Sequence, residues 1–522
     1  MSSRVHPTAG PMAALVRAAA FVAAMSVARA VDFSVVVYNV ENFFDVDGVS
    51  AYEDYAPEKY GPRHLAVKAA NIASVLSRVD GGRGPGIVVL NEIELDQTPR
   101  SGIRDLKTWL EKHRGTPLAG LLAADPLPAE LAGLPAEAWL SKALDDAGLG
   151  SYEIATTSER PGSYEDGRPV AVRSVILSKF PIEETRTHFT RGARAILEAR
   201  ILVDGHPLTV FANHWKSGAG DIESERLRMA NAETLRGRID EILAADPHAD
   251  ILIAGDLNSH YNQDRRYRHF RKTAINDILG SQGNELALLG GRAGLYNLWF
   301  ELPSDKRGSD IFKGEWGTLM HILLTRGLYD FRGIQYADNS FAVLSLPGLN
   351  ADVFGRPRRW SRGETPAGFS DHFPLYAKFR TVADGDTGRT IGLRKPSETP
   401  FGSGEPVAVN ISPVDLFRNA LDPAAHDLFS AELDGRVFRV EGPAWIDGRG
   451  RANIHVCGSN FVLFTPDKVL RSKIRELVRA QGKLALFGEL GTFRGERQFV
   501  LHGREWLLSV PDSAPALKPE KG

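Results

Sequence analysis

Cysteine is almost absent from this sequence. Cys457 is the only cysteine among 522 residues, so the chain can form no internal disulfide and no thiolate zinc site of the zinc-finger kind. We expect Cys457 to be a small buried residue. A large net charge is also lacking, since 63 Lys and Arg against 65 Asp and Glu give a formal net charge of −2. The whole chain therefore has no strong field for a polyanion, and a nucleic-acid site must be a local patch.

Long hydrophobic runs are missing except near the N-terminus. The small apolar run 18–28 follows Arg4 and Arg17 and ends in Ala28-Arg29-Ala30, the pattern of a secretory signal with its cleavage site. This run has about half of the ~20 residues that span a bilayer. We therefore expect the mature chain to begin near Val31, to be exported to the periplasm or secreted, and to have no stable membrane association. An uncleaved anchor is the alternative.

Four apolar runs in the first half of the chain are typical of buried strands. They open at Asp32, Ile87, Leu208 and Ile251, and each leads into polar side chains. Amphipathic spacing predicts helices over 64–79 and 222–244. Because open α/β sheets bind ligands at strand ends, we expect these distant segments to meet at one polar site.

The side chains at these strand ends have the chemistry for metal-assisted phosphoryl transfer. They are Asn39, Glu41, Glu92, Asn213, His214, Asp256 and Asn258, joined later in the chain by Ser370, Asp371 and His372. Mg²⁺ prefers oxygen ligands, which Glu92 with Glu41 or Asp256 would supply. Amides hold phosphate oxygens without adding negative charge, and two histidines suit general acid and base roles. Each residue alone is more often a turn or a helix cap, so the prediction depends on their joint placement.

The composition changes between Arg380 and Pro413, where Gly, Ser, Thr, Pro and charged residues predict a linker. Beyond it we expect strands over 435–440, 452–456 and 461–464, a helix over 467–480, and two strands within 483–508. Five strands with a helix between the third and fourth match the order of an OB-fold barrel. The stretch 117–149, rich in Ala, Leu, Pro and Gly, predicts an inserted, partly helical excursion.

Five ordered motifs resemble those of the endonuclease/exonuclease/phosphatase superfamily, which includes deoxyribonucleases, abasic-site endonucleases, sphingomyelinases and inositol-polyphosphate 5-phosphatases. They are Tyr-Asn-Val-Glu-Asn-Phe-Phe-Asp at 38–45, Leu-Asn-Glu-Ile-Glu at 90–94, Asn-His-Trp-Lys-Ser at 213–217, Gly-Asp-Leu-Asn-Ser at 255–259 and Ser-Asp-His-Phe-Pro-Leu at 370–375. The resemblance covers about residues 33–380. It implies a four-layer α/β sandwich, two mixed sheets flanked by helices, and hydrolysis of phosphate esters with Mg²⁺ or Mn²⁺.

The resemblance also implies a role for each motif residue. Metal and phosphate ligands are matched by Asn39 and Glu92, with Glu41 in an assisting role. Asp256 matches the group that orients or activates water beside the metal. Asn258 matches a phosphate contact, and His214 an imidazole that stabilises charge or protonates the leaving oxygen. Asp371 and His372 match the closing acid–imidazole pair.

Two positions depart from the family pattern. Asn91 stands where the family usually has Gln before its metal-binding Glu, a change we expect to matter little. Met320 stands where the family normally has the Asp that orients the catalytic histidine, and a thioether cannot do this, so the resemblance leaves the basicity of His372 in question. His321 is not expected to compensate, because adjacent strand residues point to opposite faces.

Basic residues near the motifs favour a nucleic-acid substrate. Arg265, Arg266 and Arg268 belong to a run of five cations and two aromatics at 265–272, and further arginines with Trp360 precede Ser370. Lys216 and Arg226 resemble those of exported bacterial nucleases, and with Asn213 complete the expected substrate contacts. Between 471 and 505, eight basic residues stand against four acidic ones.

We therefore expect a signal peptide (1–30), a catalytic domain (31–380), a linker (381–413), an OB-like domain (414–510) and a tail (511–522). The expected function is an exported metal-dependent phosphodiesterase, with a nuclease acting on DNA or RNA favoured. A phosphatase or a lipid or inositol phosphodiesterase is the second hypothesis. The third is a catalytically weak or inactive protein that binds nucleic acid or phosphate.

Overall fold

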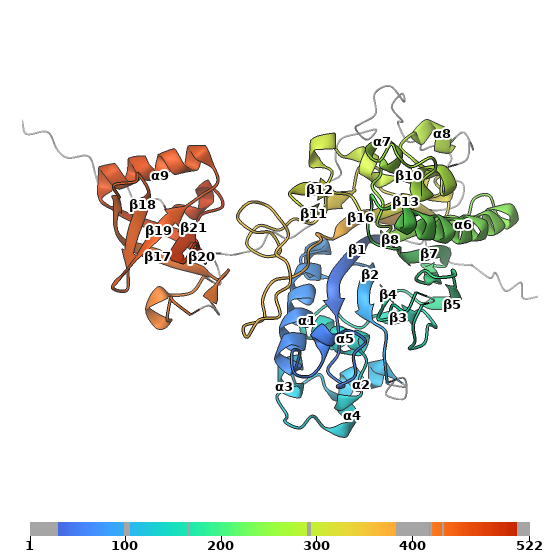
Figure 1. The fold of residues 1–522 in the computed structure, drawn as a ribbon, viewed down its shortest axis with the longest axis horizontal. Helices are drawn as coiled ribbons and strands as arrows, with labels where there is room; N and C mark the ends of the chain where they lie inside the picture. Colours follow the sequence, from blue (N-terminus) through green and yellow to red (C-terminus); the bar gives the residue numbers. More distant parts are fainter. Residues whose placement is uncertain are drawn as a thin grey trace, which may run out of the picture.

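The computed structural model describes residues 30–98, 105–164, 166–289, 294–382, 417, 420–430 and 433–508. They form an α/β sandwich and a β-barrel (Figure 1). The predicted signal peptide before Ala30, the predicted linker from residue 383 onward, and the predicted tail lie outside the described residues.

The first large sheet contains the strands that carry the N-terminal motifs. Its order is β14-β16-β1-β2-β4-β3, with β15 paired to β16. β1 and β2 are parallel, and the other pairs are antiparallel. The strands are β1 Asp32–Phe43, β2 Ile87–Glu94, β3 Glu153–Thr156, β4 Val172–Ser178, β14 Ile334–Tyr336, β15 Ala342–Val343 and β16 Leu375–Thr381.

The second large sheet carries the next two motifs. Its order is β5-β6-β7-β8-β13-β10-β9, and the neighbours β7 and β8 are parallel. The strands are β5 Ile182–His188, β6 Ile196–Val203, β7 His206–His214, β8 Asp250–Asp256, β9 Ser281–Gln282, β10 Leu295–Asn297 and β13 Met320–Leu324. The apolar runs at Leu208 and Ile251 thus form central strands, as predicted.

Side-chain alternation along β1 explains why the two sheets stack. Val35 and Val37 point into the core between the sheets, together with residues of β8 and β13. Val36 and Tyr38 point to the other face, where they pack with helices of the first sheet's outer layer. A strand buried on both faces must be apolar throughout, which is why this run lacks the usual polar alternation.

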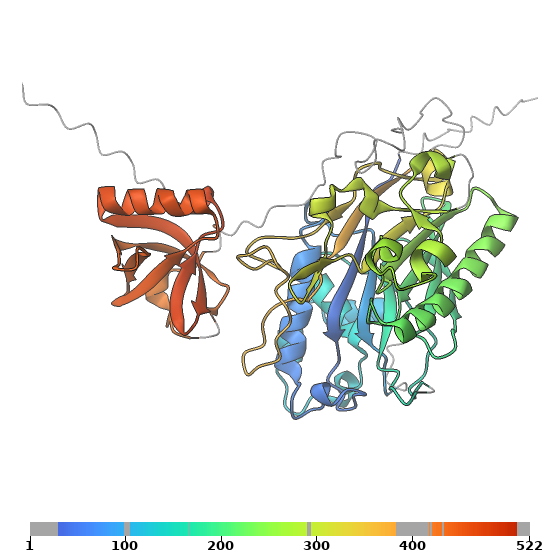
Figure 2. The same ribbon diagram turned by 45° about the horizontal axis from the view of Figure 1, so that its top comes forward.

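Helices cover the two outer faces and complete the predicted four-layer sandwich (Figure 2). α1 (Pro62–Leu76) and α5 (Ala136–Asp146) pack on the first sheet, and α6 (Ile222–Ala245) packs on the second. The predicted excursion at 117–149 holds α3 (Leu118–Leu121), α4 (Ala129–Ala132) and α5. The other short elements are α2 Leu106–Lys112, α7 Gln263–Arg266, α8 Glu285–Leu289, β11 Asp310–Phe312 and β12 Glu315–Gly317.

The C-terminal strands form a closed barrel of order β17-β18-β19-β21-β20. The predicted strand and helix order is confirmed, with α9 between the third and fourth strands. The elements are β17 Val437–Ile446, β18 Ala452–Val456, β19 Ser459–Phe464, α9 Lys468–Gln481, β20 Lys483–Phe493 and β21 Glu496–Val500. Asp467 caps α9 by accepting hydrogen bonds from the backbone of Val469 and Leu470.

One expectation about a single residue is wrong. Cys457 is exposed rather than buried, because it lies in the turn between β18 and β19 with a φ of 49°. A residue at such a turn faces solvent whatever its hydrophobicity. Within the described ranges, every helix is too short or too polar to cross a membrane.

Candidate active site

The ends of β1 and β2 are bent out of regular strand geometry. The β1–β2 register shifts between Asn39 and Phe43, and the β2–β4 register shifts between Leu90 and Ile93. Glu41 and Glu92 have φ values of 51° and 65°. Such left-handed conformations are rare for residues other than glycine and gather at functional sites. The bulges re-aim the side chains of both motifs.

Asn39 joins the two sheets at the predicted meeting point. Its Nδ2 donates to Glu92 Oε1 at 2.9 Å and to Asp256 Oδ2 at 3.1 Å. Glu92 comes from the first sheet and Asp256 from the end of β8 in the second. The expectation that these distant strand ends converge on one polar site is therefore confirmed.

His214 lies beside this junction as a neutral imidazole. Its Nε2 is 3.7 Å from Glu92 Oε1, and the side chain is buried. Burial, Arg194 and His372 all lower its pKa well below the usual histidine value. A neutral ring has one nitrogen that can accept a proton.

His372 lies on the other side of the junction in the opposite charge state. Its Nε2 is 3.7 Å from Asp371 Oδ1 and 3.9 Å from Asp256 Oδ2. Burial lowers its pKa, but Asp371, Asp310 and further carboxylates outweigh this and raise it to about 9. One site thus holds a neutral and a protonated imidazole near neutral pH, an arrangement that separates acid and base roles.

Asp256 and Asn258 form a tight turn at the end of β8. Asp256 Oδ1 accepts a hydrogen bond from the Asn258 backbone at 2.9 Å, and Asn258 has a φ of 48°. The Asn258 amide donates to the Trp215 carbonyl at 3.1 Å. Both side chains are buried, so the turn presents a rigid acid–amide pair to the junction.

Two asparagines hold the framework behind this turn. Asn91 Oδ1 accepts from the Asp256 backbone at 2.8 Å, and its Nδ2 donates to the Asn213 carbonyl at 2.9 Å. The shorter amide therefore still links β2 to both β7 and β8. The Asn213 side chain is fully buried and accepts from Trp215 Nε1 at 3.1 Å, so its position corrects the expectation of a substrate contact.

Gly255 allows β7 and β8 to approach each other beside this framework. Its φ is 124°, and a Cβ there would lie 2.0 Å from the Asn213 carbonyl oxygen. Only glycine fits this backbone conformation and this spacing. The Gly-Asp-Leu-Asn motif therefore has a structural as well as a chemical requirement.

Glu41 occupies a different place from the one expected of a metal ligand. Its Oε1 accepts from Arg359 at 2.9 and 3.2 Å, and its Oε2 accepts from the Trp360 backbone at 2.8 Å. Both oxygens are therefore engaged by the loop that precedes Ser370. Glu41 orders that loop in this structure, and Glu92 and Asp256 remain the acidic residues of the junction.

Lys68 is a buried site residue that the sequence analysis missed. Its Nζ donates to the carbonyls of Glu41 and Phe369 at 3.2 and 2.7 Å, and burial lowers its pKa to about 7. The spacing held a clue, because Lys68 lies on the apolar stripe of α1 between Leu65 and Ile72. Lys68 ties the bent end of β1 to the loop that carries His372.

Arg194 was also missed, and no motif marks it. It donates to the Trp215 carbonyl at 2.9 Å and lowers the pKa of His214. Lys216, a predicted substrate residue, is half-buried nearby, and its pKa is lowered by burial and by Arg168 and Arg194. These three cations form a basic edge beside His214.

The other predicted substrate cations are more exposed. Arg265 and Arg268 lie on the surface at and after α7. Arg266 pairs with Glu315 of β12 at 2.9 Å, which places the basic run beside the β11–β12 hairpin. Arg226 is exposed on α6 and pairs with Glu223 at 3.0 Å.

Met320 is a core residue beneath the junction. It is fully buried between the sheets, and its sulfur accepts a hydrogen bond from the Asn39 backbone at 3.2 Å. His321 points the other way and contacts the Ser259 carbonyl at 2.7 Å. The strand alternation thus keeps His321 from replacing the missing acid, as expected.

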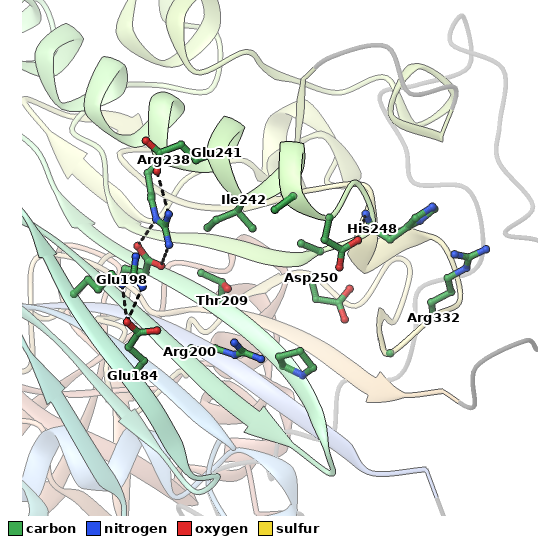
Figure 3. A pocket seen from close by; sticks show the side chains of 16 residues that line it. Glu184, Glu198, Arg200, Thr209, Arg238, Glu241, Ile242, His248, Asp250 and Arg332 are labelled. Atoms are coloured by element: carbon green, nitrogen blue, oxygen red, sulfur yellow. Dashed lines mark hydrogen bonds and ion pairs between the residues drawn. The ribbon is translucent and has the colours of Figure 1, made fainter.

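A second concave surface lies at the opposite ends of β7 and β8 (Figure 3). It includes Thr209 and Asp250, whereas the junction contains His214 and Asp256 from the far ends of the same strands. Its charged side chains pair with one another, as in the contacts of Arg238 with Glu198 at 2.9 Å. The motif side chains of the junction therefore do not line this pocket.

Comparisons with known proteins found one matching family model and several similar solved structures. Residues 176–381 match the model of the Endonuclease/Exonuclease/phosphatase family. The resemblance to this family is confirmed. The matched segment includes His214, Asp256 and His372, and the fold brings Asn39 and Glu92 to them from outside it.

Solved structures similar to this chain include truncated TDP2 from Caenorhabditis elegans, with 16% identity, 67% of this chain and 98% of that chain covered, and a TM-score of 0.34. Another is an endonuclease/exonuclease/phosphatase family protein from Bacteroides thetaiotaomicron, with 12% identity, 68% and 97% covered, and a TM-score of 0.38. No curated protein matches the sequence.

Proposed function

We propose that this chain is an exported, divalent-metal-dependent phosphodiesterase that hydrolyses nucleic acid. The observation that carries the proposal is the Asn39 amide, which is shared by Glu92 and Asp256 and flanked by two histidines of opposite charge state. A phosphate diester needs its charge offset, its water activated and its leaving oxygen protonated. The junction has a group for each task.

The acidic residues of the junction fit a hard divalent cation. Burial raises the pKa of Glu92, and the nearby carboxylate of Asp371 raises it further. A cation between Glu92 and Asp256 would relieve this crowding and use the oxygen ligands that Mg²⁺ and Mn²⁺ prefer. When bound, such an ion neutralises charge on the non-bridging phosphate oxygens.

The chain's own groups divide the remaining work. Asp256 accepts a proton from the attacking water, and protonated His372 donates a hydrogen bond to the phosphate. The Asn258 amide binds a non-bridging oxygen. His214, whose ring is neutral in the free protein, donates an N–H hydrogen bond to the leaving oxygen, and the proton that this oxygen takes up comes from protonated His372.

The β11–β12 hairpin supports a nucleic-acid substrate. It exposes Phe312 and Trp316, which are 70% and 41% accessible. Trp316 stacks on Phe373, the residue after His372, and its carbonyl accepts from Arg266. Exposed rings beside cations suit unstacked bases and the phosphates that join them. A small sugar phosphate would not need this apolar surface.

The proposals of export and of a role for the barrel are based on the sequence. The basic, apolar and small-residue pattern at 1–30 supports removal of a signal peptide and a periplasmic or secreted enzyme. The motifs all precede residue 381, so we assign the chemistry to the sandwich. We propose that the barrel adds affinity for long polymers.

A substrate panel tests the proposed function. Protein that begins at Val31 and keeps the barrel would be given plasmid, single-stranded DNA, RNA, sphingomyelin and inositol phosphates, each with Mg²⁺, Mn²⁺ or EDTA. We expect metal-dependent cleavage of polynucleotides. Cleavage confined to sphingomyelin or inositol phosphates would contradict the nuclease proposal and favour a lipid or inositol phosphodiesterase. Binding of polynucleotide with no turnover in either metal would also contradict the nuclease proposal and favour a non-catalytic binding protein.

A further inference from the structure

His372 has a ring nitrogen that needs a partner. Its Nδ1 is buried and has no hydrogen-bond partner among the described residues. A catalytic imidazole without an acceptor on its far nitrogen has no fixed tautomer and loses stabilisation of its charged form. The family residue for this task is replaced by Met320, so another residue must do it or the site is weak.

We propose that Asp310 is the positioning residue of His372, so that the orienting acid has moved from strand β13 to the β11–β12 hairpin. This inference rests on the proposed function, since it assigns a residue to the same site. It concerns the orientation of the imidazole rather than direct contact with substrate.

The backbone places the two side chains together. Asp310 and His372 form an antiparallel β-bridge, and the Phe373 N–H donates to the Ser309 carbonyl at 2.6 Å. Residues directly opposite each other in an antiparallel pair project from the same face, with Cβ atoms about 4.5–5.5 Å apart. The side chains of Asp310 and His372 therefore project from the same face of this pair.

Gly317 makes room for the carboxylate on the other side. It pairs with Asp310 across the hairpin, and a Cβ at Gly317 would lie 2.1 Å from Asp310 Oδ2. Gly317, Asp310 and His372 thus form a row in which the first position must have no side chain. The carboxylate is also buried and accepts from the Leu319 backbone at 3.4 Å.

The charges of the row favour an acid–imidazole pair. Burial raises the pKa of Asp310 to about 6, and the charge of His372 opposes this rise. Asp310 in turn is among the carboxylates that keep His372 protonated. A buried carboxylate beside a buried cation is expected only where the two interact directly or through water.

The other candidate partners of His372 face different sides. Asp371 and Asp256 lie near its Nε2, at 3.7 and 3.9 Å. Met320, at the family position, offers only a thioether, whose sulfur already accepts from the Asn39 backbone at 3.2 Å. Asp310 is therefore the acid that remains for the far side of the ring.

Three variants of the metal-loaded protein test the role of Asp310. Asp310→Asn keeps the shape of the side chain but not its charge, and should lower kcat by about 100-fold or more with KM within about threefold. Asp305→Asn, an exposed aspartate in the preceding turn, should retain wild-type kcat. The double variant Asp310→Asn with Met320→Asp should have a kcat at least tenfold higher than that of Asp310→Asn alone, because the acid returns to the family position.

A second readout does not depend on turnover. In nitrogen-15 NMR of the labelled protein, the His372 Nδ1 proton should give a downfield signal that Asp310→Asn removes and Asp305→Asn keeps. Unchanged kcat, or an unchanged His372 signal, in folded Asp310→Asn would overturn the proposal, as would a folded double variant that recovers nothing. If the wild type cleaves no phosphodiester, the proposed function fails, whereas the NMR comparison still decides whether Asp310 pairs with His372.

Discussion

The side-chain amide of Asn39 lies 3.1 Å from the carboxylate of Asp256, across the boundary between the two sheets. The same nitrogen also reaches Glu92. The site is therefore not a property of either sheet, and exists only when the sheets pack in this register. Changes at Asn39 should alter the electrostatics of the junction first.

Asn39→Asp should destabilise the metal-free protein. The change removes a donor from two carboxylates and adds a third negative charge, so we expect the free energy of unfolding to fall by about 1–3 kcal/mol. Urea titration in EDTA measures this loss, and added Mg²⁺ should reverse part of it. Asn262→Asp, at the start of α7, is the matched control. A variant as stable as the control in EDTA would show that the acids do not repel each other.

The charge of His372 should make stability depend on pH in a defined window. Its pKa is raised to about 9 in the fold, against about 6.5 in an unfolded chain. The folded state therefore binds the proton more tightly, and this stabilisation is complete below about pH 6.5 and is lost as the pH rises through 9. Urea titrations in EDTA should show the decline in the wild type and a smaller one in His372→Gln. Equal slopes in both proteins would refute the assigned charge state.

Trp316→Ala should weaken binding of single strands. Stacking of a base on an aromatic side chain contributes about 1–3 kcal/mol, so KM for a single-stranded oligonucleotide should rise roughly 5- to 150-fold. Turnover of bis-p-nitrophenyl phosphate, which has no bases, should change little. Phe189→Ala, which changes an exposed ring just after β5, is the control. Equal KM values for the two variants would remove the hairpin from the substrate surface.

Much of this architecture could be predicted because its signals are local. The apolar runs of β1, β2, β7 and β8 and the motif order depend on neighbouring residues, so their strands and their convergence followed from the sequence. Asp310 could not be found in this way. Its strand has three residues and is too short to show the alternation of polar and apolar residues that marks a strand. Its partner His372 lies 62 positions later in the chain.

The direction of an amide at a strand end was also beyond the sequence. Asn213 and Asn39 occupy similar places in their motifs, yet Asn213 points into the framework and Asn39 into the junction. A shift of one residue reverses the face that a strand residue occupies. Asn39 follows Val35 and Val37 on the face between the sheets, whereas Asn213 follows Phe211 on the opposite face of its own sheet. The bulge after Asn39 turns Glu41 toward Arg359, and no residue pattern predicts this bulge.

Removal of the barrel should separate affinity from chemistry. A chain that ends at Val382 should keep the kcat of the full chain on a short oligonucleotide, because the whole junction precedes that point. Its affinity for long polymers should fall, and the dependence of affinity on salt should become shallower as phosphate contacts are lost. Fluorescence anisotropy at several salt concentrations measures both. A folded truncation with no turnover would show that the barrel contributes to the site.

The most direct measurement is metal re-addition with a matched pair of variants. A labelled single-stranded oligonucleotide would be given to the wild type, to Glu92→Ala and to Glu183→Ala, a surface glutamate of β5 that pairs with Arg200, first in EDTA and then in excess Mg²⁺. We predict no turnover in EDTA, full recovery in the wild type and Glu183→Ala, and at least a thousandfold lower rate in folded Glu92→Ala. Full wild-type activity in EDTA, or full activity of Glu92→Ala in Mg²⁺, would contradict the account.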